Sequence, residues 1–150
     1  MIFSTKSAEE TEEIGALLAK ALDVANIKSA FIALRGEMGV GKTAFTRGFC
    51  SYFGIHGVKS PTYTVVNEYR GSSSVFHFDM YRIESDDDLY SIGYDDYVER
   101  DGFCIVEWSE NIYDLLPSDR ITATIERDGE DESRRKIIID LGTKYENISI

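Results

Sequence analysis

The feature that most constrains this chain is the octapeptide GEMGVGKT at residues 36–43. It matches the pattern G-x-x-x-x-G-K-[ST], in which glycines let several backbone N–H groups turn toward one bound phosphate. Lys42 adds a positive charge beside the outer phosphates, and the hydroxyl of Thr43 is an oxygen ligand suited to Mg²⁺. The octapeptide therefore predicts a site for a nucleoside triphosphate.

The sequence on both sides of the octapeptide supports this prediction. Residues 29–34 form an apolar run that predicts a buried strand. Residues 42–53 place aromatic side chains at helical spacing, and Gly54 follows as a helix stop. Strand, glycine loop and helix in this order point a helix N-terminus at phosphate. The alternative is an ordinary glycine-rich turn, which need not lie between a buried strand and a helix.

Composition limits the class of protein. With 150 residues, 43% of them hydrophobic, the chain fits one globular domain over residues 1–150. Its formal net charge of -11 argues against direct, charge-driven binding to nucleic acid, but leaves open a small basic patch or a partner that holds nucleic acid. No apolar run approaches the roughly 18 residues of a membrane span, and no signal-peptide pattern opens the chain, so we expect a cytoplasmic protein.

The two cysteines, Cys50 and Cys104, each lie in an apolar stretch. This placement favours buried free thiols in a reducing compartment over a disulfide. The chain has no C-x-x-C pair and no His/Cys cluster, which argues against a zinc site.

The N-terminal region predicts a strand and a helix. Residues 2–4 fit a short edge strand, and Ser7 with Glu10 three residues later fits a capping box that starts a helix. Apolar residues from Ile14 to Ala25 then recur at helical spacing. We favour a helix that simply docks on the sheet; alternatively, its first turn, with Thr11, lies beside a bound base.

The middle of the chain contains a hydroxyl-rich segment, SPTYT at residues 60–64, followed by a hairpin predicted over residues 64–79. P-loop NTPases commonly place a switch that senses the γ-phosphate at this position, so a switch and an ordinary loop are equally compatible with it. Residues 85–93 predict a short capped helix, in which the aspartates at 86–88 fit capping charges better than a metal site.

The remaining elements are predicted from similar local patterns. One helical turn is expected over residues 94–100, and a short helix over residues 111–116 that Pro117 stops. Residues 121–125 and 136–141 predict a C-terminal hairpin. Arg134 and Arg135, beside its turn, either approach the nucleotide or are solvated.

Two predicted strands end in acidic residues. Residues 103–107 form an apolar strand that ends at Glu107, and Asp79 ends an earlier strand. Because the carboxyl ends of parallel strands converge on the ligand crevice, both acids are expected beside the P-loop. Glu107 is the stronger candidate to hold Mg²⁺, directly or through water, and Asp79 competes for that role or orients water. A strand-end carboxylate that caps the next turn is the plainer alternative for each.

Several of these motifs together resemble one family. The stretches GEMGVGKT, SPTYT, HFDMYR at residues 77–82, Ile92-Gly93 and Val106-Glu107-Trp108 occur in the order and at the spacing of the TsaE family. These small bacterial ATPases are required for threonylcarbamoyladenosine modification of tRNA. The resemblance covers about residues 7–140.

The resemblance implies an α/β fold, a P-loop NTPase-like three-layer sandwich with a mixed central sheet. It implies ATP bound by the Lys42 side chain and the loop backbone, with Mg²⁺ held by Thr43 and Glu107 and with Asp79 nearby. Trp108 would shape the site, and Thr11 would lie near the base. The implied nucleotide-binding positions in the loop are Glu37, Met38, Gly39, Val40, Gly41, Lys42, Thr43 and Ala44.

The resemblance also implies a switch-like loop with Thr62 and Thr64, and protein partners of the TsaB and TsaD type. From the residues alone, the chain is a nucleoside triphosphate hydrolase or a kinase. It lacks an Asn-Lys-x-Asp run for guanine, which favours ATP. No evident arginine finger is present: Arg47 is expected to point away, and Arg82 is only a candidate. We therefore expect slow hydrolysis that a partner completes; the alternatives are a small-molecule kinase and a nucleotide-gated binding module with little catalysis.

Overall fold

The computed structural model describes residues 1–61 and 65–150. Within these residues, seven strands form one mixed sheet in the order β1-β7-β6-β2-β5-β4-β3. The strands are β1 (Ile2–Thr5), β2 (Ala30–Arg35), β3 (Val66–Arg70), β4 (Ser74–Asp79), β5 (Phe103–Glu107), β6 (Ile121–Arg127) and β7 (Arg135–Asp140). The helices are α1 (Ala8–Val24), α2 (Lys42–Tyr52), α3 (Asp86–Ser91), α4 (Tyr94–Glu99) and the 3₁₀ segment η1 (Ser109–Leu115). The predicted switch residues Thr62 and Thr64 lie outside the described residues.

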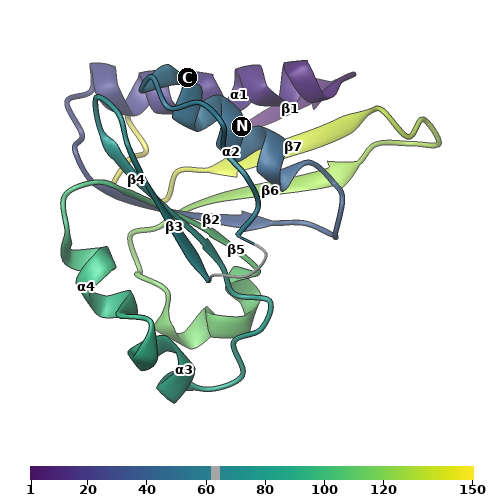
Figure 1. The fold of residues 1–150 in the computed structure, drawn as a ribbon. Coiled ribbons are helices and arrows are strands. Elements are labelled where there is room, and N and C mark those ends of the chain that lie inside the picture. Colours follow the sequence, from purple (N-terminus) through teal and green to yellow (C-terminus); the bar gives the residue numbers. More distant parts are fainter. Residues whose placement is uncertain (62–64) are drawn as a thin grey trace.

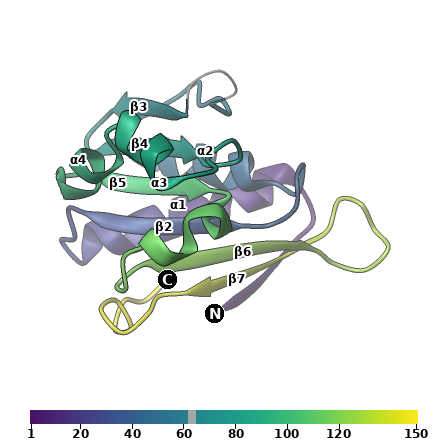
Figure 2. The ribbon, with the colours of Figure 1, turned by 90° about the horizontal axis from the view of Figure 1, so that it is seen from below.

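The centre of the sheet is parallel and its margins are antiparallel. Strands β6, β2, β5 and β4 run parallel, whereas β3 pairs antiparallel with β4, and β7 pairs antiparallel with both β6 and β1. Both predicted hairpins and the N-terminal edge strand are therefore confirmed. Figure 2 shows the turn between β6 and β7 projecting from the rest of the molecule.

Helices cover both faces of the sheet, which confirms the predicted three-layer α/β sandwich. Figure 1 shows α1 and α2 on one face, and α3, α4 and η1 on the other. Each face has its own apolar core. The first is formed by residues such as Leu18, Phe45, Phe49, Ile32 and Ile105, and the second by residues such as Phe31, Phe76, Phe78, Leu89 and Tyr94.

The helix starts follow the predicted capping patterns. Ser7 caps α1 by accepting the backbone N–H of Glu10, and Ser85 caps α3 by accepting that of Asp88. The aspartates of α3 thus lie in a capped first turn, as predicted. Gly93, with φ of 73°, separates α3 from α4. The short helix predicted over residues 111–116 is present as a 3₁₀ helix, but it begins two residues earlier, at Ser109, and ends at Leu115.

The two cysteines are buried free thiols, as predicted. Burial raises the pKa of both the Cys50 and the Cys104 thiol to about 12, because the charged thiolate is poorly solvated in the core. Both therefore stay protonated and act as small apolar side chains at neutral pH. In the described part of the chain, no helix is both long and apolar enough to cross a bilayer.

Two glycines let α1 and α2 pack backbone against backbone. A Cβ atom added to Gly48 would lie 1.8 Å from the carbonyl oxygen of Glu12, and one added to Gly15 would lie 2.1 Å from that of Phe45. Atoms do not approach so closely without displacing the backbone. This contact fixes α2 against α1, and thereby fixes where the N-terminus of α2 points.

Replacement of Gly48 tests this contact. Within a helix, alanine is normally more stable than glycine by about 1 kcal/mol. Gly48→Ala is nevertheless expected to destabilise the protein by about 1–3 kcal/mol because of overpacking. Urea unfolding followed by circular dichroism measures the change. Arg47→Ala, at the neighbouring exposed position, is the control and should change stability by less than about 1 kcal/mol. A Gly48→Ala variant more stable than wild type would contradict the assignment.

Candidate active site

The P-loop joins the end of β2 to the start of α2 through three glycines with positive φ. Gly36, Gly39 and Gly41 have φ values of 151°, 75° and 120°, which side chains with a Cβ rarely adopt. Gly41 is the N-cap of α2 and provides no side-chain cap. The first N–H groups of α2 are therefore available to an anion rather than to a capping side chain.

Lys42 lies across this loop. Its side chain is buried, and its Nζ donates a hydrogen bond to the carbonyl oxygen of Gly36 at 2.8 Å. The same Nζ lies 4.2 Å from the centre of the Trp108 ring, a cation–π contact. The ammonium is thus held inside the site by groups that are much weaker partners than a phosphate would be.

One cavity gathers most of the predicted residues. It has a volume of about 410 Å³. Its lining is formed by Met38, Gly39, Gly41, Lys42, Thr43, Ser60, Asp79, Glu107 and Trp108. In it, the hydroxyl of Thr43 lies 3.3 Å from that of Ser60. The ends of β4 and β5, the P-loop and the first turn of α2 therefore meet in one place.

The two acids face each other across neighbouring strands. Asp79 in β4 is the register partner of Glu107 in β5. Glu107 is buried, while Asp79 is half-buried and accepts a hydrogen bond from the backbone N–H of Tyr81. Burial raises the pKa of Asp79, and the charge of Glu107 adds to the shift, against the lowering effects of Tyr81, His77 and Lys42.

This donor set fits Mg²⁺. Two carboxylates and one hydroxyl are hard oxygen ligands, and a divalent cation would favour the ionised form of Asp79 that burial disfavours. Among the described residues, no group of three or more His, Cys, Asp and Glu side chains forms a complete metal site. Mg²⁺ commonly uses only one or two carboxylates, with water and phosphate oxygens filling its remaining positions.

His77 neighbours the site and opens the HFDMYR stretch of the family resemblance, but the sequence analysis assigned it no role. Its Nε2 lies 2.7 Å from Oε2 of Glu107, and its side chain is fully buried. A local signal was a histidine among the apolar residues of the strand 75–78, where packing alone favours a hydrophobic side chain.

Trp108 follows Glu107 in a left-handed backbone conformation with φ of 58°, which is rare for a bulky residue. Its ring lies 5.1 Å from that of Tyr81 and contacts Lys42. Trp108 lines the smaller cavity, and the expectation that it shapes a nucleotide site stays a prediction.

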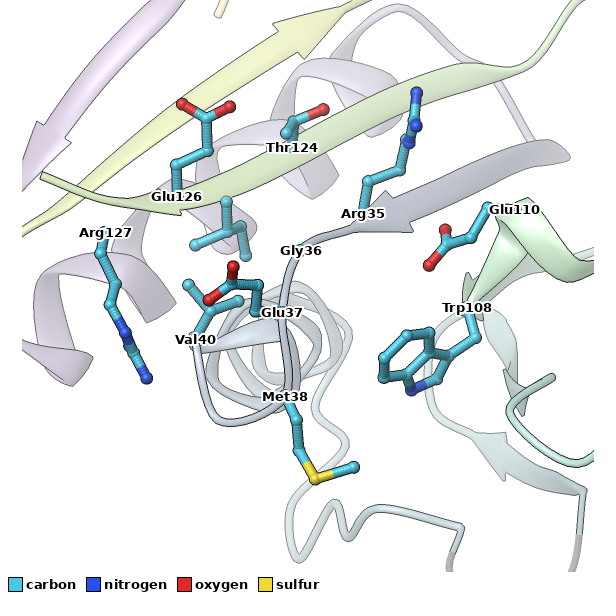
Figure 3. Close-up of a pocket in the computed structure, with 11 residues that line it drawn as sticks. Arg35, Gly36, Glu37, Met38, Val40, Trp108, Glu110, Thr124, Glu126 and Arg127 are labelled. Carbon is cyan, nitrogen blue, oxygen red and sulfur yellow. The ribbon is translucent and has the colours of Figure 1, made fainter.

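A larger cavity of about 950 Å³ also borders the P-loop, and Met38 and Trp108 line both cavities. Figure 3 shows the loop carrying Glu37, Met38 and Val40, with Trp108 facing it from the start of η1. The lining also includes Arg35, Gly36, Glu110, Thr124, Ile125, Glu126 and Arg127. Lys42, Thr43 and the two acids do not line this cavity, so the smaller one is the better candidate for phosphate and metal.

The P-loop is also bordered by α1 and β7. Thr11 is buried, and its methyl carbon Cγ2 would lie 3.8 Å from a Cβ atom added to Gly41. Its hydroxyl shares a 3.0 Å hydrogen bond with that of Thr5, so it is already paired. Arg135 donates from Nε to the carbonyl oxygen of Val40 at 2.6 Å. Of the two arginines beside the hairpin turn, Arg135 thus contacts the loop while Arg134 is exposed.

The remaining candidates lie at the margins. Ala44 is buried in the first turn of α2. Arg47 points away from the loop and pairs with Glu12 at 2.7 Å, as expected. Arg82 is exposed beside Tyr81 and Trp108. Lys42 is therefore the only basic side chain that lines the smaller cavity within the described part of the chain.

Comparison with known proteins gives a consistent result. A family model described as threonylcarbamoyl adenosine biosynthesis protein TsaE matches residues 5–137. A Bacillus subtilis (strain 168) protein named tRNA threonylcarbamoyladenosine biosynthesis protein TsaE is 38% identical over 144 residues, which covers 95% of this chain and 87% of that protein. A Haemophilus influenzae protein of the same name is 41% identical over 101 residues, which covers 66% of this chain and 64% of that protein. The crystal structure of YdiB from Bacillus subtilis aligns with a TM-score of 0.76 and 32% identity, over 97% of this chain and 88% of that chain.

The raised pKa of Asp79 predicts a pH-dependent effect on stability. Its carboxyl binds a proton more readily in the folded than in the unfolded protein, so its contribution is favourable at low pH and is lost as pH rises through the folded pKa. Asp79→Asn should therefore stabilise the metal-free protein at pH 7 and have little effect near pH 3. Urea unfolding at both values, in the presence of a chelator, measures this.

Asp101→Asn is the matched control, because it removes one acidic group at an exposed position. It separates the local effect from a general relief of the net charge of -11. Equal stabilisation by the two variants, or an Asp79→Asn effect that does not grow between pH 3 and 7, would contradict the prediction.

Proposed function

This chain belongs to the TsaE family, and from that membership we propose that it is a Mg²⁺-dependent ATPase that supports tRNA threonylcarbamoyladenosine biosynthesis. The observation that carries the proposal is the single cavity in which Lys42, Thr43, Asp79 and Glu107 meet at the N-terminus of α2. ATP is the proposed nucleotide because the sequence lacks the guanine-reading run. The buried free thiols suit the reducing cytoplasm, which is the proposed location.

Each group in the cavity has a role that follows from its chemistry. The N–H groups of residues 39–44 and the ammonium of Lys42 hold the phosphates, with Lys42 exchanging the Gly36 carbonyl for a phosphate oxygen. Thr43 and Glu107 hold Mg²⁺, and Asp79 joins the metal or orients the attacking water. When bound, Mg²⁺ neutralises charge that develops on the phosphate oxygens.

The cavity supplies little positive charge for hydrolysis. Among the described residues that line it, two are carboxylates and only Lys42 carries a positive charge. Phosphoryl transfer depends on charge neutralisation, and an added arginine finger accelerates it by roughly 10³–10⁵-fold in other P-loop enzymes. We therefore infer that the isolated chain hydrolyses ATP slowly and that a partner completes the site.

The proposed partners are proteins of the TsaB and TsaD type, which would together carry out the transfer to tRNA. A net charge of -11 makes strong direct contact with nucleic acid unfavourable, so tRNA would be held by a partner. The larger cavity beside the P-loop leaves a small-molecule kinase as an alternative, since it offers space for an acceptor. Phosphate recovered on an added acceptor, rather than released as free phosphate, would support the kinase. Tight ATP-dependent partner binding without product would support a binding module.

Substitutions in the cavity test the nucleotide site. Lys42→Ala should weaken ATP binding by about 10–100-fold, because a charge-assisted hydrogen bond contributes about 1.5–3 kcal/mol. Isothermal titration calorimetry with Mg²⁺ present measures this. Lys20→Ala, which removes an exposed charge from α1, should bind ATP as wild type does. Absence of ATP binding by the wild type, even with its partners, would overturn the proposal.

Substitutions of the proposed metal ligands test catalysis separately. Thr43→Ala and Glu107→Gln should each lower Mg²⁺-dependent phosphate release by about 10–100-fold, the usual effect of disturbing a metal site. Release of phosphate is followed by a coupled assay with and without the partner proteins. Wild-type rates in both variants would show that the metal assignment is wrong.

A further inference from the structure

His77 lies at a buried position of the sheet, where an apolar side chain is usual. It lies in β4 between Phe76 and Phe78, and all three side chains are fully buried. Because side chains alternate along a strand, the two phenylalanines face the α3–α4 layer, while His77 shares the α2 face with Val75 and Asp79. His77 is thus directed toward the same face of the sheet as the candidate site.

Only one of the two ring nitrogens of His77 has a hydrogen-bond partner among the described residues. Nε2 lies 2.7 Å from Oε2 of Glu107, but the buried Nδ1 has no hydrogen-bond partner in the part of the chain that the structure describes. Buried polar atoms are normally paired, so each orphan needs an explanation. An aliphatic side chain would fill the space without an orphan atom, so packing does not account for histidine; its contact with Glu107 does.

The chemistry of the pair assigns the donor. A carboxylate that serves as a Mg²⁺ ligand only accepts hydrogen bonds, so in that role the contact between Nε2 and Oε2 places the hydrogen on Nε2. That bond engages one oxygen of Glu107 and leaves Oε1 without a hydrogen-bond partner among the described residues. Glu107 also lines the cavity with Thr43, so its uncommitted oxygen is the one available there.

The two acids of the cavity have separate orienting donors. Asp79 accepts the backbone N–H of Tyr81 through Oδ1 at 2.9 Å, whereas Glu107 accepts Nε2–H of His77 through Oε2. Each carboxylate keeps one oxygen for another ligand. Metal-binding carboxylates are typically oriented by such outer hydrogen bonds.

We propose that His77 is a positioning residue that fixes the carboxylate of Glu107 so that its second oxygen is presented to Mg²⁺. The inference rests on the proposed function, because it needs Glu107 to serve the metal. His77 itself touches neither metal nor nucleotide in this role. It acts through the rotamer of Glu107, so its loss should weaken metal binding more than nucleotide binding.

The test compares two substitutions of one side chain. His77→Leu removes the donor and fills the core, while His77→Gln keeps an N–H donor at a similar reach. Mn²⁺ replaces Mg²⁺ as the probe, and its binding to the protein with a non-hydrolysable ATP analogue is followed by electron paramagnetic resonance. His77→Leu should raise the Mn²⁺ dissociation constant by about 10–100-fold, and His77→Gln by less than about threefold.

Two further readouts separate positioning from a structural role. Val75→Ala loosens the same face of β4 without contacting Glu107, so it should lower the unfolding temperature and leave the Mn²⁺ constant unchanged. In phosphate release, His77→Leu should need a higher Mg²⁺ concentration to reach half of its maximal rate. Its KM for ATP at saturating Mg²⁺ should be unchanged. If His77→Leu does not fold, His77→Met is judged by the same criteria.

The possible outcomes distinguish the two proposals. Wild-type Mn²⁺ affinity in His77→Leu, or equal loss in His77→Leu and His77→Gln, overturns the role of His77 and leaves the proposed function standing. Weakened Mn²⁺ binding in Val75→Ala to the same extent also overturns it. Failure of the wild-type protein to bind Mn²⁺ with the nucleotide overturns the proposed function, and this inference with it.

Discussion

The register of three parallel strands determines the geometry of the site. Leu34 of β2 pairs with Glu107 of β5, which pairs in turn with Asp79 of β4. The three strands therefore end in one row, and the P-loop leaves β2 two residues beyond that row. A shift by one residue in either pairing would turn an acid to the opposite face of the sheet, away from α2. The apolar residues on both faces hold the register, so the packing of the core and the placement of the acids depend on the same interaction.

The sequence predicted the local part of this arrangement well. The octapeptide, the strand before it and the helix after it are local patterns, and so are the capping serines Ser7 and Ser85. Both strand-end acids were also identified, because the end of an apolar run can be read directly from the sequence. The expectation that they converge needed one general rule about parallel sheets, and the observed register agrees with it.

The sequence did not predict the contacts between distant segments. The bond between His77 and Glu107 joins residues 30 apart, and that between Arg135 and Val40 joins residues 95 apart. Hydrophobic periodicity shows which face of an element is buried but not which residue lies opposite. The backbone contact at Gly48 is another example. From the sequence, a glycine inside a helix only lowers the stability of that helix, and its packing against α1 becomes visible in the structure. The start of η1 was missed because Trp108 adopts a left-handed conformation that no sequence rule favours for tryptophan.

The unfavourable features of the structure gather around one cavity. Asp79 is an acid whose charged form is disfavoured by burial, His77 carries a buried unpaired nitrogen, and Trp108 has a positive φ. Each of these features lowers stability, and none is needed to build the sheet, since an amide, an aliphatic residue and a glycine would serve the fold at least as well. Glu107 connects all three: it pairs with Asp79, bonds to His77 and precedes Trp108. Because strained and unsatisfied groups often persist where function requires them, these features mark Glu107 as a candidate functional residue without reference to the P-loop motif. Two independent lines of reasoning, one from phosphate-binding backbone and one from local instability, thus lead to the same cavity.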